Sequence, residues 1–198
     1  MRIEIKRHLD MWQEIKDSAV FTLHKDTGKY PDSDWKKRML IAEHSPIRVG
    51  YIIINCYGVP SYVINHIVRH NVGFTPFVSS LRSDRHESET VPDRNTPNNL
   101  RFDGNFQALI NISRRRLCTS ADPQTRAFWG RVLAAIYEVE PELWFACVPE
   151  CIYRGGCPEY PKTCGWFDKF RKRHKDVDLL DVHARYEAYA LEYLGGED

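Results

Sequence analysis

The segment of residues 48–58, RVGYIIINCYG, constrains the fold most, because it is the most strand-like stretch of the chain. It is short, rich in β-branched and aromatic residues, and runs to a turn residue, Gly58. This pattern predicts a buried strand. The first residues, MRIEIKRHLDMW, alternate apolar and charged side chains, which predicts a second, half-buried strand.

Other segments have the apolar spacing of helices. Residues 32–44 begin with Asp32 or Ser33 as an N-cap, and Pro60 fits the first turn of a helix that leads down to residues 69–70. Further helices are predicted at residues 105–117 with Asp103 as the cap, at 123–139 after Asp122, from Pro141, and at 176–194. Residues 77–82 predict a short extended segment, and 83–104 and 151–166 predict loops.

Composition limits the class of protein. The chain of 198 residues is 42% hydrophobic and has no apolar run long enough to cross a bilayer, which predicts one soluble domain over residues 1–198 and no membrane partner. Lys and Arg number 28 against 27 Asp and Glu, so the net charge gives no long-range attraction to a nucleic-acid polymer. The start lacks the apolar core of a signal peptide, which favours a cytoplasmic protein.

One group of residues has the chemistry of an anion site. Arginine presents a planar fork that suits phosphate, and serine hydroxyls can complete a phosphate cradle. The candidates are Arg69, His70, Ser79, Ser80, Arg82 and Arg85. The alternative is structural, because basic residues at a helix C-terminus also complement the helix dipole.

Three consecutive arginines occupy residues 114–116 of a predicted helix. Three consecutive helical positions span most of the circumference, so at least one of these side chains faces inward, where an unpaired charge is costly. An inward arginine requires an anion or a polarised carbonyl. An intramolecular salt bridge meets the same requirement.

A Cys-rich loop is predicted at residues 147–166. Within it, Cys151, Cys157 and Cys164 lie next to or near glycines, and they can form a tetrahedral metal site if Cys118 or Cys147 supplies the fourth thiolate. We take Cys118 as the fourth ligand. Zinc and an Fe–S cluster are not separated by the sequence, and free thiols packed as small apolar residues are the alternative.

No Gly-rich dinucleotide fingerprint, Walker loop, Gly-x-Ser-x-Gly elbow or His-Glu-x-x-His pair is present. Four other elements occur in order between about residues 40 and 140: EHSPIR; RHN, then seven intervening residues and Ser79; SLR at residues 80–82; and NFQALINISRRR. Together they resemble the motifs of the flavin-dependent thymidylate synthases, the ThyX family.

This resemblance implies an α+β fold with a small antiparallel sheet packed against several helices. It also implies a homotetramer that holds FAD between subunits. The family reaction converts dUMP to dTMP with methylenetetrahydrofolate and NADPH. Hydride comes from the reduced flavin, and no cysteine attacks the pyrimidine. Two alternatives stay open: transfer of another one-carbon group, such as hydroxymethyl, to a related pyrimidine nucleotide, and a non-catalytic relative that binds nucleotides or a metal.

The resemblance also implies roles for single residues. Near FAD it places Ser45, Arg69, His70, Asn71, Asn105, Gln107 and Asn111. Near dUMP it places His66, Arg69, Ser79, Ser80, Leu81, Arg82 and Arg116. Arg116 has the catalytic role, because it falls where the family has the arginine that polarises the uracil ring. The sequence departs from the motif at Asn71, where the family has arginine, and at His66, where it has glutamine.

Overall fold

The computed structural model describes residues 1–25, 28–82, 84 and 91–195. Its contacts divide the chain into two compact units. The first combines Met1–Pro31 with Ser45–Leu109, and the second combines Asp32–His44 with Ile110–Asp198. That residues 1–198 fold as a single domain stays a prediction.

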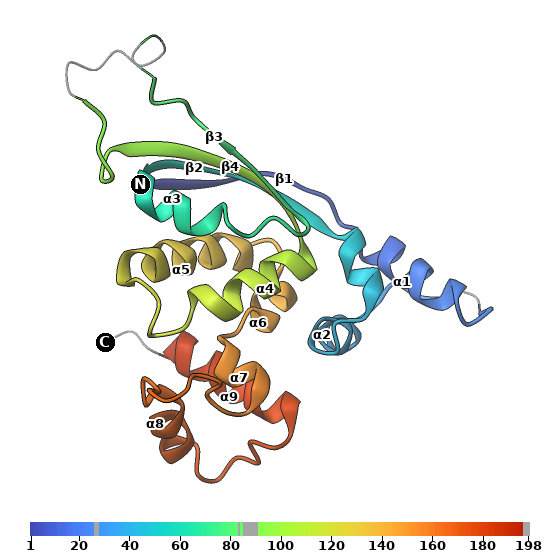
Figure 1. Cartoon of the computed structure of the whole chain (residues 1–198). Helices are drawn as coiled ribbons and strands as arrows, with labels where there is room; N and C mark the ends of the chain where they lie inside the picture. The colour runs from blue at the N-terminus through green and yellow to red at the C-terminus, as the bar shows by residue number, and fades with distance from the viewer. Residues whose placement is uncertain (26–27, 83, 85–90, 196–198) are drawn as a thin grey trace. The chain divides into compact units, whose positions relative to one another are not determined.

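The first unit contains a four-stranded sheet (Figure 1). Its strands are β1 (Arg2–His8), β2 (Tyr51–Pro60), β3 (Phe74–Val78) and β4 (Pro97–Asn105). The order is β1-β2-β4-β3, and each neighbouring pair is antiparallel. The α+β class and the small antiparallel sheet are therefore confirmed.

Strand β2 is a central strand, and Ile52, Ile53 and Ile54 are all buried, as expected of its nearly continuous apolar run. The prediction that it ends at Gly58 is wrong. Gly58 adopts a left-handed backbone at φ +67°, and the pairing with β4 shifts register between Cys56 and Val59. The glycine therefore bends the strand at a bulge, and pairing continues to its last residue.

Residues 83–104 were predicted to be a loop, and that prediction is wrong from Pro97 onward, because β4 begins there and runs to Asn105. Its side chains alternate, with Asn98, Leu100 and Phe102 buried. The buried Asn98 amide donates a hydrogen bond of 3.0 Å to the Ser79 carbonyl. The polar composition of this segment did not indicate a strand, because the buried Asn98 side chain gains its hydrogen-bond partner only when β3 and the residue after it lie beside β4.

The helical elements of this unit are α1 (Trp12–Phe21), the 3₁₀ helix η1 (Ser45–Val49) and α3 (Ser61–Ile67). Helix α3 lies against one face of the sheet (Figure 1) and confirms the helix predicted after Pro60. Helix α1 was not predicted. Its Trp12 is buried and packs against the Phe106 ring at a centroid distance of 5.6 Å.

Helix α4 (Phe106–Arg116) carries the chain from the first unit into the second. Asp103 was predicted to be its cap, but Asp103 lies in β4, paired with Ile53 and Thr75. The Asn105 side chain is the cap instead, since its Oδ1 accepts a hydrogen bond of 2.8 Å from the Ala108 amide. The strand thus ends where the helix begins.

The second unit is helical in the residues that the structure describes. Its remaining helices are α2 (Ser33–Ile41), α5 (Pro123–Tyr137), α6 (Pro141–Ala146), α7 (Glu150–Arg154), α8 (Trp166–Arg173) and α9 (Val182–Gly195). Asp32 and Asp122 cap α2 and α5 as predicted, accepting hydrogen bonds of 2.7 Å and 2.8 Å from backbone amides three residues later. None of the described helices has the length and apolarity that a membrane span requires.

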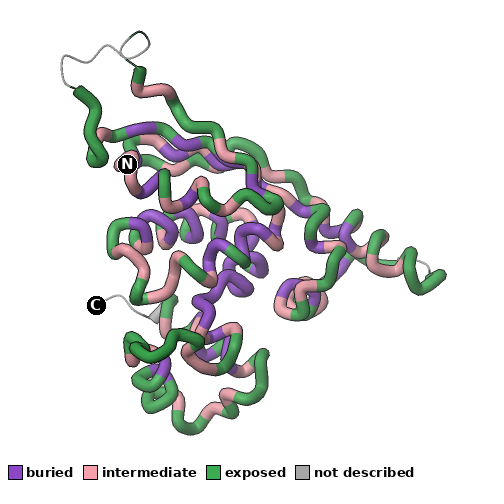
Figure 2. Tube along the Cα trace, viewed as in Figure 1, coloured by how far each residue is buried: buried purple, intermediate pink, exposed green. Residues whose placement is uncertain are grey.

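Helix α5 forms much of the core of this unit, and Figure 2 shows the buried positions along it. The buried Trp129 indole donates a hydrogen bond of 2.8 Å to the buried Ser113 hydroxyl. Two predicted boundaries are wrong. The predicted loop at 151–166 begins inside α7, and the tail helix begins at Val182, because Asp181 accepts hydrogen bonds from the His183 and Ala184 amides.

The contact between Gly50 and Phe106 gives a stability test. A Cβ on Gly50 would lie 2.5 Å from Cε2 of the buried Phe106 ring. We expect Gly50→Ala to lower the free energy of unfolding by about 1–3 kcal/mol, the range for an overpacked core. Gly156→Ala is the matched control, because a Cβ there has nothing within 4 Å. Urea denaturation followed by circular dichroism measures both variants, and equal losses would contradict the packing account.

Candidate functional site

Three segments of the first unit meet at the start of helix α4. The Asn105 amide donates a hydrogen bond of 2.9 Å to the Gly73 carbonyl, and the Phe106 amide donates one of 3.0 Å to the Gly50 carbonyl. Gly50 follows η1, and Gly73 ends the segment after α3. The backbone therefore brings η1, residues 68–73 and the first turn of α4 together.

Most of the predicted FAD-binding residues lie on these three segments. They are Ser45 on η1; Arg69, His70 and Asn71 after α3; and Asn105 and Gln107 at the start of α4. Ser45, Arg69 and Asn71 are exposed. Asn111, the remaining candidate, belongs to the second unit.

Gly73 is required for this approach of the backbone. Its φ is +69°, and a Cβ there would lie 2.6 Å from the Asn105 side-chain nitrogen. Only glycine meets both conditions without strain, since other residues rarely adopt this backbone and have no room for a side chain. Gly73 thus lets the segment that carries residues 69–71 lie directly against Asn105, the residue that caps α4.

The predicted dUMP-binding residues lie in two places. His66 and Arg69 are at the end of α3, whereas Ser79, Ser80, Leu81 and Arg82 follow β3. Because β3 rises by ~3.3 Å per residue, its first and last residues, Phe74 and Val78, are separated by roughly 13 Å. Within one chain, the residues predicted to form one phosphate cradle are therefore divided between the two ends of β3. Arg85, also predicted for this cradle, lies outside the described residues.

The second of these places is open to solvent. Arg82 pairs with Asp84, with Nε 2.9 Å from Oδ1, and the two side chains are 68% and 55% exposed. Ser79 lines a shallow groove of about 310 Å³ on the sheet, beside Tyr57, Phe77 and Arg101. An exposed ion pair of this kind contributes little to stability, so another anion can replace Asp84.

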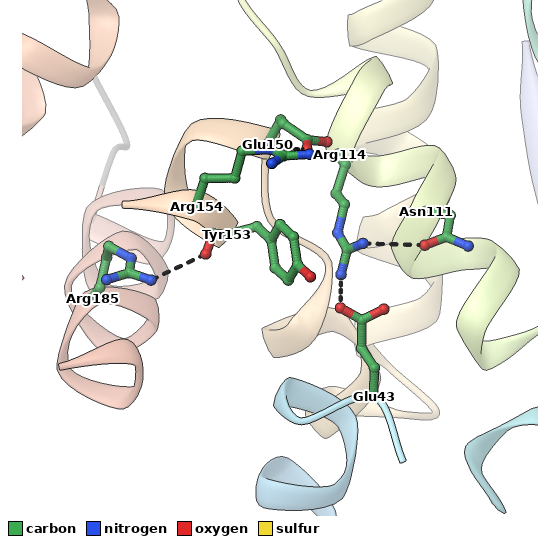
Figure 3. Close-up of polar contacts among 7 residues, drawn as sticks. All are labelled: Glu43, Asn111, Arg114, Glu150, Tyr153, Arg154 and Arg185. Atoms are coloured by element: carbon green, nitrogen blue, oxygen red, sulfur yellow. Dashed lines mark hydrogen bonds and ion pairs between the residues drawn. The ribbon is translucent and has the colours of Figure 1, made fainter. Parts of the chain in front are cut away.

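The three arginines at the end of α4 divide into two kinds. The Arg114 side chain is 12% exposed and forms an ion pair with Glu43 (Figure 3). Its guanidinium also lies over the Tyr153 ring, 3.5 Å from the centroid, and donates a hydrogen bond of 3.3 Å to Asn111. The prediction that one arginine faces inward is confirmed, and an intramolecular salt bridge satisfies it.

Arg115 and Arg116 line a cavity of about 760 Å³ in the second unit, which we call the cysteine cavity. Its walls include four aromatic side chains, Trp166, Phe167, Tyr189 and Tyr193. All four predicted metal ligands also line it: Cys118, Cys151, Cys157 and Cys164. The predicted catalytic residue and the predicted metal ligands therefore share one cavity.

In the described part of the chain, no three His, Cys, Asp or Glu residues are positioned to hold a metal ion together. Cys56 and Cys147 are buried, and burial raises the pKa of each thiol to about 12. For Cys147, a hydrogen bond with Ser113 and the charge of Arg114 offset part of that rise. These two cysteines are packed as small apolar residues, which is the alternative that the sequence left open to a metal site.

Sequence reasoning missed the polar residues that hold α7. Arg185 is 4% exposed, and its Nε donates a hydrogen bond of 2.5 Å to the Ile152 carbonyl. Its Nη2 donates one of 3.1 Å to the Tyr153 carbonyl (Figure 3). Glu43, the partner of Arg114, adopts a left-handed backbone at φ +52°. Arg185 belongs to no motif, and Glu43 is the first residue of the EHSPIR element, but each acquires its partner only in the fold.

The Arg114–Glu43 pair can be tested by removing one charge. We expect Glu43→Gln to lower the free energy of unfolding by about 2–3 kcal/mol, because it leaves a mostly buried guanidinium without its counter-charge. Asp84→Asn makes the same chemical change in the exposed pair with Arg82, and we expect it to cost no more than about 0.5 kcal/mol. Chemical denaturation measures both, and a loss below 0.5 kcal/mol for Glu43→Gln would refute the structural role.

No family model matches the chain. A segment of 71 residues, 36% of this chain, is 32% identical to the flavin-dependent thymidylate synthase of Clostridium tetani (strain Massachusetts / E88). The match spans 28% of the length of that relative.

Two crystal structures of ThyX from Helicobacter pylori, each with FAD and dUMP, have a similar fold, with a TM-score of 0.59 and 14% identity over 75% of this chain. They are covered over 100% and 99% of their own length. The chain therefore has the fold of ThyX and a segment similar in sequence to a flavin-dependent thymidylate synthase, which confirms the resemblance that its motifs predicted.

Proposed function

We propose that this protein is a flavin-dependent thymidylate synthase that methylates dUMP to dTMP with methylenetetrahydrofolate and NADPH. The observation that carries the proposal is the fold similarity to ThyX structures that contain FAD and dUMP, over 75% of the chain. The order of the sequence motifs supports it independently of the fold. FAD is the cofactor, and the cytoplasm is the compartment that we expect.

The residues around the start of α4 fit FAD by their chemistry. Arg69 is an exposed, permanently charged donor that suits a diphosphate. Asn71, Asn105 and Gln107 are amides that can donate to and accept from a flavin ring or a ribose, and Ser45 and His70 add further hydrogen-bonding groups. When bound and reduced, FAD supplies the hydride. The role of these residues, with Asn111, is to bind and orient it.

The nucleotide phosphate requires cations that can leave their present partners. Arg82 meets this condition, because its ion pair with Asp84 is exposed and weak. Ser79 and Ser80 add hydroxyl groups, and the Leu81 backbone adds an amide. Phosphate binding there would hold the pyrimidine in place for reaction.

The separation of the two substrate-binding segments supports a site built from several chains. His66 and Arg69 lie before β3, and Ser79–Arg82 lie after it, so one strand keeps them apart. A second copy of the chain can supply one set beside the other. We therefore propose that the protein acts as a homotetramer, with FAD and dUMP bound where copies meet.

Arg116 is the residue that we propose to be catalytic. Uracil C5 becomes nucleophilic only as negative charge builds on the ring carbonyl oxygens and N3. A fixed guanidinium at that edge stabilises the charge where it develops. Arg116 is half-buried and lines the cysteine cavity.

Transfer of a different one-carbon group, such as hydroxymethyl, is a second candidate reaction. It is favoured by Asn71 and His66, which stand where the family has arginine and glutamine. We assign Asn71 to the flavin site and His66 to the nucleotide site, so the two substitutions can change which one-carbon group is transferred to the pyrimidine. The mass of the nucleotide product distinguishes methyl from hydroxymethyl.

Release of tritium from C5-labelled dUMP tests the reaction and the role of Arg116. With methylenetetrahydrofolate, NADPH and FAD present, we expect the native protein to release tritium and Arg116→Ala to lose at least about 100-fold in rate, as when one charge-stabilising donor is removed. The absorption of bound flavin should be unchanged in Arg116→Ala.

Arg131→Ala is the control, because Arg131 is an exposed arginine of α5 outside the cysteine cavity. It should turn over like the native protein. Native protein that binds FAD but releases no tritium would favour a non-catalytic relative. Full turnover by Arg116→Ala would refute the mechanism.

A further inference from the structure

A groove of about 380 Å³ on the second unit contains none of the residues that we assign to FAD, to dUMP or to catalysis. It is lined by residues of α2, α6 and α9 and by Tyr137, the last residue of α5. Its volume lies within the range of roughly 300–1,000 Å³ that is usual for sites of small ligands. We call it the Glu142 groove, after the buried carboxylate on its wall.

Two aromatic side chains of α6 form a fixed wall of the Glu142 groove. Trp144 and Phe145 both line it, and both are mostly buried. The Trp144 ring packs edge-to-face against Tyr137 at a centroid distance of 5.0 Å and against Tyr193 at 5.7 Å. The indole is therefore held by two other rings, and it offers a ligand a rigid apolar surface.

Glu142 is a buried carboxylate that lines this groove. Its residue is 9% exposed, yet none of the residues that the structure describes forms a hydrogen bond or an ion pair with its side chain. A buried carboxylate requires donors in place of the water that it has lost. Glu142 lies in the first turn of α6, where a helix favours an acidic residue. The helix would favour an exposed carboxylate equally, so this position does not explain the burial.

The charged residues of the groove leave an excess of negative charge. Glu187 of α9 is a second carboxylate on its wall and is exposed. Lys37 of α2 supplies one ammonium group, whose Nζ lies over the Phe145 ring, 4.6 Å from the centroid. In the described part of the chain, Lys37 forms no ion pair with either carboxylate. Two carboxylates and one ammonium group are therefore complemented by one further monovalent cation.

A guanidinium group has the chemistry that this wall requires. It is a permanent monovalent cation, its N–H groups match the two oxygens of a carboxylate, and its flat face stacks on aromatic rings. A quaternary ammonium group would supply the charge, but it has no N–H to donate to Glu142. The contact of Lys37 with Phe145 shows that the aromatic wall already attracts a cation.

We propose that the Glu142 groove binds a small molecule with a guanidinium head and an apolar tail. The head pairs with Glu142, and the tail lies against Trp144 and Leu191, whose side chain is 70% exposed on the same groove. Glu187 adds a weaker, solvent-screened attraction at the rim. This ligand is separate from the flavin and the nucleotide of the proposed reaction.

Isothermal titration of the native protein with butylguanidine tests the proposal. We expect one molecule to bind per chain. Butylurea has the same shape without the charge, and we expect it to bind at least about 10-fold more weakly, because a hydrogen bond to a charged group is lost. The heat of binding requires neither flavin nor turnover, so this result is independent of the proposed reaction.

Substitution of single carboxylates locates the site. We expect Glu142→Gln to weaken the binding of butylguanidine by about 10-fold or more, and Glu187→Gln to weaken it less, because Glu187 is exposed. Glu138→Gln is the matched control and should bind like the native protein, because Glu138 is exposed and lies outside the groove. Circular dichroism checks that each variant is folded.

Three results would overturn the proposal. The first is native protein that does not bind butylguanidine or that binds butylurea equally well. The second is unchanged affinity in folded Glu142→Gln. The third is binding of an arginine-containing peptide without binding of butylguanidine, which would assign the groove to a protein partner.

Discussion

Two backbone hydrogen bonds at the start of helix α4 determine where most of the candidate residues lie. The backbone N–H of Asn105 donates a hydrogen bond to the Gly73 carbonyl, and the backbone N–H of Phe106 donates one to the Gly50 carbonyl. The segments that carry Ser45, residues 69–71 and Gln107 meet because these bonds join their backbones. Removing either bond would separate donors that we propose to act together on FAD.

The same helix shows how one fold assigns different roles to adjacent, identical residues. Successive helical side chains point about 100° apart, so a run of three arginines cannot share one environment. Arg114 is held by Glu43 and covered by Tyr153. All three arginines line the cysteine cavity, and Arg114 does so while it is paired with Glu43. Arg115 is exposed and Arg116 is half-buried, so the three side chains have different surroundings on one helix.

The elements that could be predicted from the sequence are those whose signal is local. The apolar run of β2 and the caps Asp32 and Asp122 depend on neighbouring residues only, and each is where the pattern placed it. Strand β4 could not be predicted from its composition, because its buried Asn98 is satisfied by the carbonyl of Ser79, which directly follows β3. The alternation of Leu100 and Phe102 with polar residues was the signal available for it.

The candidate site follows the same rule. Short-range motifs identified the residues around the start of α4 and the inward arginine. The sequence could not show that β3 separates Arg69 from Ser79, since that depends on strand length and pairing. Nor could it show that Cys118, the thiol chosen over Cys147, lines the cysteine cavity whereas Cys147 is packed in the core.

The central claim, that this fold binds a flavin, is tested most directly by an absorption spectrum. The purified protein is mixed with FAD, and unbound flavin is removed by gel filtration. The account predicts that the flavin bands elute with the protein at a stoichiometric ratio. Protein that elutes folded and without flavin would contradict the account.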